Sequence, residues 1–259
     1  MSDPAPRADS HITRLRLAEL ALLRPYIMRN ARVLEIGGGN GFQAAVLTSW
    51  GCDVTSIDIN SNGRWARQYF PVSTYDGAHL PFESSHFDIV FSSNVLEHVR
   101  GLQDLLVETA RVLRLGGNAV HVLPTPLWRL WTILTHYPYL VKRIVIGRTE
   151  DVGLRSRSEN GVAGALPVAE MAWRALVPQA HGEFRSSIDE IFQYRRSIWQ
   201  ERFAAAGLDL QQSIPTGIFY TGNAIFPDLS LRARCAVSRV LGSACQVFIL
   251  RHRDSLGDP

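Results

Sequence analysis

The chain has 259 residues, of which 46% are hydrophobic, and its formal net charge is +3. This length suits one large α/β domain with an insertion better than two independent domains. The mildly basic balance is far from the strongly basic character of nucleic-acid-binding proteins, so we expect no nucleic-acid partner. Three cysteines, Cys52, Cys235 and Cys245, form no paired spacing. We therefore expect a reducing, cytoplasmic compartment.

Residues 1–29 are predicted to form a polar tail and one helix. The first ten residues lack the apolar core of a secretion signal. From His11 to Leu23, apolar side chains recur among arginines, which indicates an amphipathic helix that ends at Pro25. Nowhere does the sequence reach the roughly 18 uncharged apolar residues expected of a membrane-spanning helix.

A strand, a glycine turn and a helix are predicted over residues 33–47. The apolar run of residues 33–36 contains Glu35, and Gly37, Gly39 and Gly41 then recur at every second position. Such glycines are typical of a tight turn with positive φ or of close approach to a ligand. A dinucleotide-binding fingerprint is disfavoured because residue 42 is Phe, and the Lys-Ser/Thr of a P-loop is missing. A turn that serves only chain reversal remains the alternative.

The second predicted strand, residues 52–58, ends in Asp58, which is followed by Ile59. Asp58 lies about 20 residues after the glycine turn, where nucleotide-binding α/β units place the acid that accepts the ribose hydroxyls. The alternative role for Asp58 is an N-cap for a helix that starts near Ser61.

Further along, a short helix around Trp65 and Tyr69 and a third strand over residues 72–75 precede Asp76 and Gly77. A fourth strand is predicted before Asn94, and the segment Leu-Glu-His-Val at residues 96–99 is predicted to open a helix. The helical period continues to Leu113, Gly116 and Gly117 are expected to cap this helix, and residues 119–123 form the fifth strand.

These four segments together resemble the class I S-adenosylmethionine (SAM) methyltransferases of type 11, the ubiquinone-biosynthesis-like family. The resemblance rests on acid-x-G-x-G-x-G, on Asp58, on Asp76-Gly77 before Leu-Pro-Phe, and on Leu-Glu-His-Val. It implies a Rossmann-like, seven-stranded, mostly parallel sheet with helices on both faces and a cap insertion after strand five. It also implies SAM as the cofactor, with Asp76 on the adenine amino group and the Gly77 N–H on a ring nitrogen. The implied cofactor-binding residues are Glu35, Gly37, Gly39, Gly41, Asp58, Ile59, Asp76, Gly77 and Asn94.

The resemblance covers residues 30–124 well and 197–253 weakly. We therefore divide the chain into a tail and helix (1–29), a SAM-binding core (30–124), a substrate-cap insertion (125–196) and the returning core (197–259). Strands six and seven are expected at residues 208–214 and 245–250, the last one antiparallel by family analogy. Helices are expected at residues 169–177, 197–207 and 228–241.

The insertion begins with residues 126–146, which are aromatic and apolar, edged with cations and interrupted by Pro138. One interpretation is a cap that packs its own small core over the active site. The other is an interfacial surface for a lipid-linked or membrane-borne acceptor, which would place the protein peripherally at the inner face of the membrane.

The expected reaction is methyl transfer to a small-molecule, glycan or lipid-linked acceptor, with O-methylation favoured over N- or C-methylation. A hydroxyl acceptor must lose a proton, and the histidines considered as its base are His98, His121, His136 and His181. His181 is the preferred catalytic base, whereas His98 is expected to be structural and His121 to lie in the core. We expect no catalytic metal, because the acids form no recognisable ligand cluster. The alternatives are a non-catalytic SAM-binding protein and another SAM-type group transfer; the sequence fixes neither the acceptor nor the oligomeric state.

Overall fold

A seven-stranded sheet forms the centre of the structure, a computed structural model that describes residues 11–59, 67–145, 178–221 and 229–253. The strand order is β3-β2-β1-β4-β5-β7-β6, and β7 runs antiparallel to both of its neighbours while the other pairs are parallel. The strands are β1 (Arg32–Ile36), β2 (Asp53–Asp58), β3 (Ser73–Thr74), β4 (Phe87–Ser93), β5 (Leu113–Pro124), β6 (Leu208–Pro215) and β7 (Cys245–His252). This order confirms the expected Rossmann-like, mostly parallel sheet.

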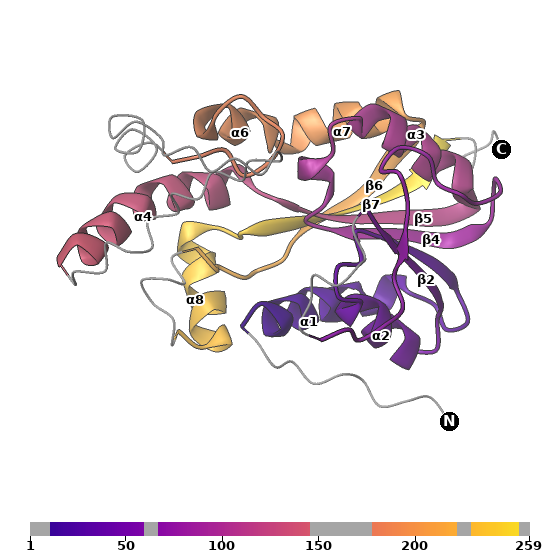
Figure 1. Ribbon diagram of the computed structural model, residues 1–259, viewed down its shortest axis with the longest axis horizontal. Helices are drawn as coiled ribbons and strands as arrows, with labels where there is room; N and C mark the ends of the chain where they lie inside the picture. Colours follow the sequence, from indigo (N-terminus) through magenta and orange to yellow (C-terminus); the bar gives the residue numbers. More distant parts are fainter. Residues whose placement is uncertain (1–10, 60–66, 146–177, 222–228, 254–259) are drawn as a thin grey trace, which may run out of the picture.

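Helices cover both faces of the sheet (Figure 1). Helices α1 (His11–Leu23) and α2 (Phe42–Ser49) lie on one face, and α3 (Leu102–Val112) and α7 (Arg196–Ala205) lie on the other. Two 3-10 turns, η1 (Arg24–Tyr26) and η2 (Leu96–His98), connect these elements to the strands. The remaining described helices are α4 (Pro126–Val145), α6 (Ser187–Gln193) and α8 (Leu231–Leu241).

Alternating side chains of the central strands build one apolar core on each face. On β1, Leu34 packs in the core under α3 and α7, whereas Val33 packs in the core over α1 and α2. On β4, Val90 packs in the same core as Leu34, and Ile89 packs in the same core as Val33. Parallel strands that are covered on both faces must be apolar on both, which explains the continuous hydrophobic runs in the sequence.

The local structure differs from the sequence prediction in four places. Helix α3 ends at Val112, and Gly116 and Gly117 lie inside a longer β5, next to an irregularity in its pairing with β4. Residues 96–98 form a 3-10 turn rather than the start of a helix. Helix α4 continues through Pro138 to Val145. The helix expected at residues 169–177 lies outside the described residues, as does Trp65; the described Tyr69 lies in no helix.

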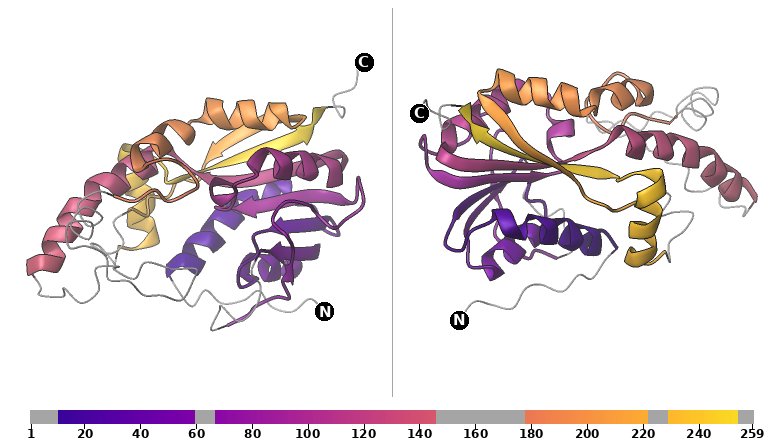
Figure 2. Two further views of the ribbon diagram at one scale, coloured as in Figure 1. Left: turned by 45° about the horizontal axis from the view of Figure 1, so that its top comes forward. Right: turned by 180° about the vertical axis from the view of Figure 1, so that it is seen from behind.

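Helix α4 reaches beyond the edge of the sheet, and α6 packs beside it (Figures 1 and 2). A buried ion pair joins the two helices: Arg129 Nε lies 2.6 Å from Glu190 Oε2, and both side chains are almost fully enclosed. The second Glu190 oxygen, Oε1, accepts the backbone N–H groups of His181 and Gly182, each at 2.6 Å. Glu190 therefore fixes the segment before α6 as well as the helix pair.

The two tryptophans at the start of α4 face the body of the protein. Trp131 donates its indole N–H to the Leu241 carbonyl at 2.9 Å, and Trp128 packs against the core beneath α3 and α7. The exposed apolar side chains of this helix lie elsewhere on it, at Leu127, Leu130, Leu134, Tyr137 and Val141. Among the described residues, no helix combines the length and hydropathy needed to cross a bilayer.

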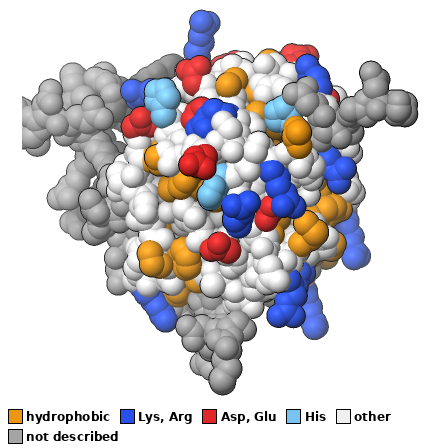
Figure 3. Space-filling model, turned by 90° about the vertical axis from the view of Figure 1, so that its right-hand side faces the viewer, with side chains coloured by type: hydrophobic (Ala, Val, Ile, Leu, Met, Phe, Trp, Pro, Cys, Tyr) orange, Lys and Arg blue, Asp and Glu red, His pale blue; other side chains and the backbone are white. Residues whose placement is uncertain are grey.

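The side of the molecule shown in Figure 3 carries acidic, basic and hydrophobic side chains intermixed. On that face the cations form no extended stripe of the kind that a nucleic-acid backbone would bind.

The Arg129–Glu190 pair gives a prediction for stability. Glu190→Ala should lower the free energy of unfolding by about 3–5 kcal/mol, because it leaves a buried guanidinium without its carboxylate. Chemical denaturation measures this change. The matched control is Glu183→Ala, which removes the exposed partner of Arg100 at 2.9 Å and should cost at most about 1 kcal/mol. Equal losses for the two variants would contradict a special role for the buried pair.

Candidate functional site

A cavity of about 990 Å³ opens at the carboxyl ends of β1, β2, β3 and β4. The strand order reverses between β1 and β4, and open α/β sheets bind ligands at such a switch point. The sequence-predicted residues that line this cavity are Gly37, Gly39, Asp58, Ile59, Asp76, Gly77 and Asn94. The fold thus brings residues from four separate segments to one place.

The glycine turn is held against β2 by backbone hydrogen bonds. Gly37 and Gly38 donate their N–H groups to the Ile57 carbonyl at 2.8 and 3.0 Å. Gly37 has φ of +78°, and a Cβ there would lie 2.3 Å from a methyl group of Val95. Only glycine can therefore bring the chain this close to the segment after β4.

Asp58 links the end of β2 to the same turn. Its Oδ2 accepts the Gly39 N–H at 2.9 Å, and its side chain lines the cavity. Gly39 also has positive φ, of +55°. The acid and the turn are therefore one structural unit, although 19 residues separate them in the sequence.

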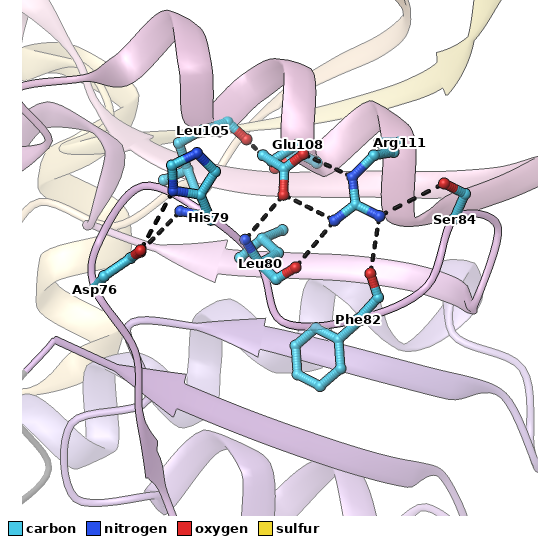
Figure 4. A network of polar contacts seen from close by, with 9 residues as sticks. Asp76, His79, Leu80, Phe82, Ser84, Leu105, Glu108 and Arg111 are labelled. Carbon is cyan, nitrogen blue, oxygen red and sulfur yellow. Dashed lines mark hydrogen bonds and ion pairs between the residues drawn. The ribbon is translucent and has the colours of Figure 1, made fainter.

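The loop that carries Asp76 is anchored to α3 (Figure 4). The Asp76 carboxylate accepts the N–H groups of Ala78 and His79, both at 2.8 Å, and these bonds hold the pKa of Asp76 below its usual value. Further along the loop, Glu108 accepts the Leu80 N–H at 2.9 Å, and Arg111 donates to the Leu80 carbonyl at 2.9 Å. The loop is thereby fixed where Asp76 and Gly77 face the cavity.

Two of the predicted cofactor-binding residues, Glu35 and Gly41, lie outside the cavity lining. Glu35 is buried beneath the glycine turn, where its carboxylate accepts the Ser56 hydroxyl at 2.5 Å. Burial, with a contribution from the charge of Asp58, raises the pKa of Glu35 to about 7 in spite of the Ser56 bond. Gly41 precedes the first residue of α2 with φ of +74°. Both residues therefore support the glycine turn without lining the cavity.

The opposite wall of the cavity comes partly from α1, which the sequence did not assign to the site. Ile12, Thr13 and Arg16 line the cavity together with Asn94 and His98. Arg16 forms an ion pair with the buried Glu19 at 2.6 Å, and the Asn94 amide lies against its guanidinium. The three-residue spacing of Arg16 and Glu19 predicts that both side chains lie on one side of a helix, but not that this side faces the cavity.

Asn94 itself has φ of +54°, a conformation that few residues other than glycine adopt and that asparagine tolerates best. The strained residue directly follows β4 and donates its N–H to the Val122 carbonyl at 2.8 Å. The Asn94 side chain is therefore held beside the cavity, at the switch point between β1 and β4.

The predicted base, His181, does not line the cavity, whereas His98 does. The two imidazole rings are 4.7 Å apart, and the His181 ring also lies 4.9 Å from Trp128. Desolvation lowers the pKa of both histidines, so both are neutral near pH 7. The buried Glu97 precedes His98, and burial raises the pKa of its carboxyl to about 8.

The other two histidines differ from these. His121 is fully buried in β5, as expected of a core histidine. Its Nδ1 lies 2.8 Å from Ser92 Oγ, whereas its Nε2 has no hydrogen-bond partner among the described residues. Desolvation lowers its pKa to about 3. His136 lies on α4 and contacts Tyr137. Neither residue lines the cavity.

The raised pKa of Glu35 predicts a pH dependence of stability. The folded state keeps a proton on Glu35 between about pH 4.5 and 7, where the unfolded chain has released it, so stability falls as pH rises through this window. Glu35→Gln keeps an acceptor for Ser56 but cannot ionise. Relative to wild type, its free energy of unfolding should gain on the order of 2–3 kcal/mol between pH 4.5 and 8.

Denaturation at several pH values measures this difference, with Glu83→Gln, at an exposed position, as the control. Parallel curves for wild type and Glu35→Gln would show that Glu35 does not titrate in this range.

Comparison with known proteins gives a consistent picture. Residues 34–121 match a methyltransferase domain family. The biotin biosynthesis bifunctional protein BioHC of Cellvibrio japonicus (strain Ueda107) is 35% identical over 142 residues, which cover 51% of this chain and 28% of that protein. A malonyl-[acyl-carrier protein] O-methyltransferase of Enterobacter lignolyticus (strain SCF1) is 33% identical over 106 residues, covering 39% and 42%. The match thus spans less than half the length of either curated relative.

Among solved structures, an S-adenosylmethionine dependent methyltransferase from Mesorhizobium loti has the same fold. Its TM-score is 0.53 at 15% identity, and the superposition covers 91% of this chain and 98% of that one. The glycine turn, Asp58 and Asp76 all fall inside the matched residues 34–121. The segment that carries these predicted site residues is therefore similar to the methyltransferase domain family.

Proposed function

We propose that this protein is a SAM-dependent methyltransferase. The observation that carries the proposal is one cavity, at the switch point of the sheet, that joins the glycine turn, Asp58 and the Asp76 loop. The structure provides no Lys-Ser/Thr at the turn for a phosphate, whereas it gathers two carboxylates beside a close backbone approach. This donor set suits a cofactor with hydroxyl, amino and cationic groups better than one with a pyrophosphate.

We assign one role to each wall of the cavity. Asp58 accepts the ribose hydroxyls, and its bond to Gly39 keeps its carboxylate oriented toward the cavity. Asp76 accepts the adenine amino group, while the adjacent Gly77 N–H serves a ring nitrogen. The backbone at Gly37 and Gly39 gives the amino-acid part of SAM room to approach. Glu35 acts from below the turn, and Asn94 lies toward the acceptor side.

SAM supplies an already activated methyl group, so the protein mainly has to align an acceptor and exclude water. The acceptor side of the cavity is formed by Thr13, Arg16 and His98. His181 reaches this space only through the ring of His98, so its proposed role is indirect. A small-molecule, glycan or lipid-linked acceptor remains our proposal, with O-methylation favoured.

The cofactor assignment predicts the effect of Asp58→Ala. Hydrogen bonds to a charged group contribute roughly 1.5–3 kcal/mol each, and 1.4 kcal/mol corresponds to about tenfold in affinity. Calorimetry should therefore show S-adenosylhomocysteine binding at least about tenfold weaker than in wild type. Asp53→Ala is the matched control, because Asp53 lies at the opposite end of β2. An Asp58→Ala variant with normal affinity and a lower melting temperature would assign Asp58 to the scaffold instead.

Two further experiments distinguish the alternative functions. Wild-type protein that binds NAD but neither SAM nor S-adenosylhomocysteine would overturn the proposed function. A screen with methyl-labelled SAM against phenols, glycans, lipid-linked sugars and acyl-carrier-bound acids then distinguishes an enzyme from a non-catalytic SAM-binding protein. Product with decarboxylated SAM only would indicate another group transfer on the same fold.

We also propose a peripheral membrane contact through residues 126–146, on a protein otherwise in the cytoplasm. The support is the exposed apolar side of α4, on which Leu127, Leu130, Leu134, Tyr137 and Val141 follow the three- and four-residue spacing of one helix face. Trp128 and Trp131 do not belong to this face, because both pack inward. An amphipathic helix of this kind can lie in the interface of a bilayer.

The membrane proposal predicts that Leu130→Ser combined with Leu134→Ser reduces binding to anionic liposomes severalfold in a flotation assay. Affinity for S-adenosylhomocysteine should stay unchanged. A control that also removes two exposed apolar side chains is Val107→Ser combined with Leu115→Ser, in α3 and β5. Absence of liposome binding by wild type would leave α4 as a cap over the site.

A further inference from the structure

We infer that Glu97, His98 and His181 form a binding site for a divalent transition-metal cation such as zinc. One carboxylate oxygen and one nitrogen from each imidazole lie within 4.8 Å of one another. Two imidazoles and a carboxylate are a common ligand set for zinc and iron(II). This departs from the sequence-based expectation that the protein holds no catalytic metal.

Glu97 supplies the strongest reason to place a cation here. Its side chain is wholly buried, and neither carboxylate oxygen has a hydrogen-bond partner among the described residues. Buried carboxylates are normally paired, hydrogen-bonded or bound to a metal. The closest approach that Glu97 makes to a base is a separation of 3.9 Å between its Oε1 and His98 Nε2.

Among the described residues, no arginine or lysine lies within ion-pair distance of Glu97. The neighbouring buried acids each have an arginine: Glu19 pairs with Arg16 at 2.6 Å, and Glu190 pairs with Arg129 at 2.6 Å. Both arginines are thus committed to other carboxylates. A divalent cation between Glu97 and the two histidines would provide the missing positive charge.

The third ligand is held in place by its backbone on both sides. Glu190 Oε1 accepts the N–H groups of His181 and Gly182, and the next N–H, of Glu183, donates to the Glu97 carbonyl at 3.0 Å. A Cβ at position 182 would lie 2.2 Å from that same carbonyl oxygen, so Gly182 permits the close approach. The segment is therefore docked directly on the turn that carries Glu97 and His98.

The geometry allows ligation after small side-chain movements. Tetrahedral zinc with bonds of about 2.0–2.1 Å separates its ligand atoms by roughly 3.3 Å. The ligand atoms here are within 4.8 Å, and the His98 side chain is 42% exposed, so its ring is free to turn toward the cation. His98 also lines the cavity, so the fourth coordination position can face an acceptor oxygen. A metal there would lower the pKa of a coordinated hydroxyl, so that its proton could be released to water without a histidine base.

Zinc alone tests the site, with tag-free protein that has been treated with a chelator. Competition against a chromophoric chelator should show one zinc per chain, and cobalt(II) should give the absorption bands of a tetrahedral site. His98→Ala, His181→Ala and Glu97→Gln should each weaken zinc binding by at least about tenfold. His86→Ala, which removes an imidazole outside the cluster, should bind zinc as wild type does.

Two results would overturn the inference: no zinc binding by wild type, or equal zinc affinity in wild type and in all three ligand variants. His98→Ala is the decisive variant if a change at the buried Glu97 prevents folding, because His98 is partly exposed. Binding of S-adenosylhomocysteine, measured on the same samples, reports on folding and on the proposed function separately. Zinc binding without S-adenosylhomocysteine binding would refute the methyltransferase proposal while leaving the metal site intact.

Discussion

The hydrogen bond from the Gly39 N–H to Asp58 is the contact on which the site depends. It closes the glycine turn of β1 onto the end of β2, and the paired bonds from Gly37 and Gly38 to the Ile57 carbonyl hold the turn in the same position. Because parallel strands end at one edge of the sheet, this local closure decides where the cavity opens. The bulk of Val95 and Ser56 then excludes any side chain at Gly37 and Gly38.

Burial of ionisable groups gives the rest of the site its rigidity. The Arg16–Glu19 pair lies within one helix, with Glu19 buried and Arg16 partly exposed, whereas the buried Arg129–Glu190 pair joins two helices. The first pair belongs to α1 on one face of the sheet. The second joins α4 to α6 in the insertion. Removal of one partner of a fully buried pair is costly, so α4 and α6 are held together by charge as well as by apolar packing.

The part of the site that the sequence predicted came from short-range rules and from the family resemblance. Glycines at alternate positions specify a turn, and an acid at the end of an apolar run specifies the carboxyl end of a strand; the structure puts Gly37, Gly39, Asp58, Asp76 and Asn94 around one cavity. Arg16 could not be placed there, because its position depends on how α1 packs under the sheet. Glu35 does not line the cavity, because its side chain is buried beneath the glycine turn, where its carboxylate accepts the Ser56 hydroxyl.

The turn at residues 96–98 shows why one pattern supports two interpretations. A regular helix beginning at Leu96 would make His98 an ordinary helix-start residue, which is what the sequence indicates. The structure forms only a 3-10 turn there, and the chain leaves it in an extended conformation at Val99. This geometry buries Glu97 while it turns His98 toward the cavity. The insertion then returns at residues 181–183 to pack on the same turn. A histidine from a distant segment thus meets an acid and a histidine that are adjacent in sequence, an arrangement that no local pattern could reveal.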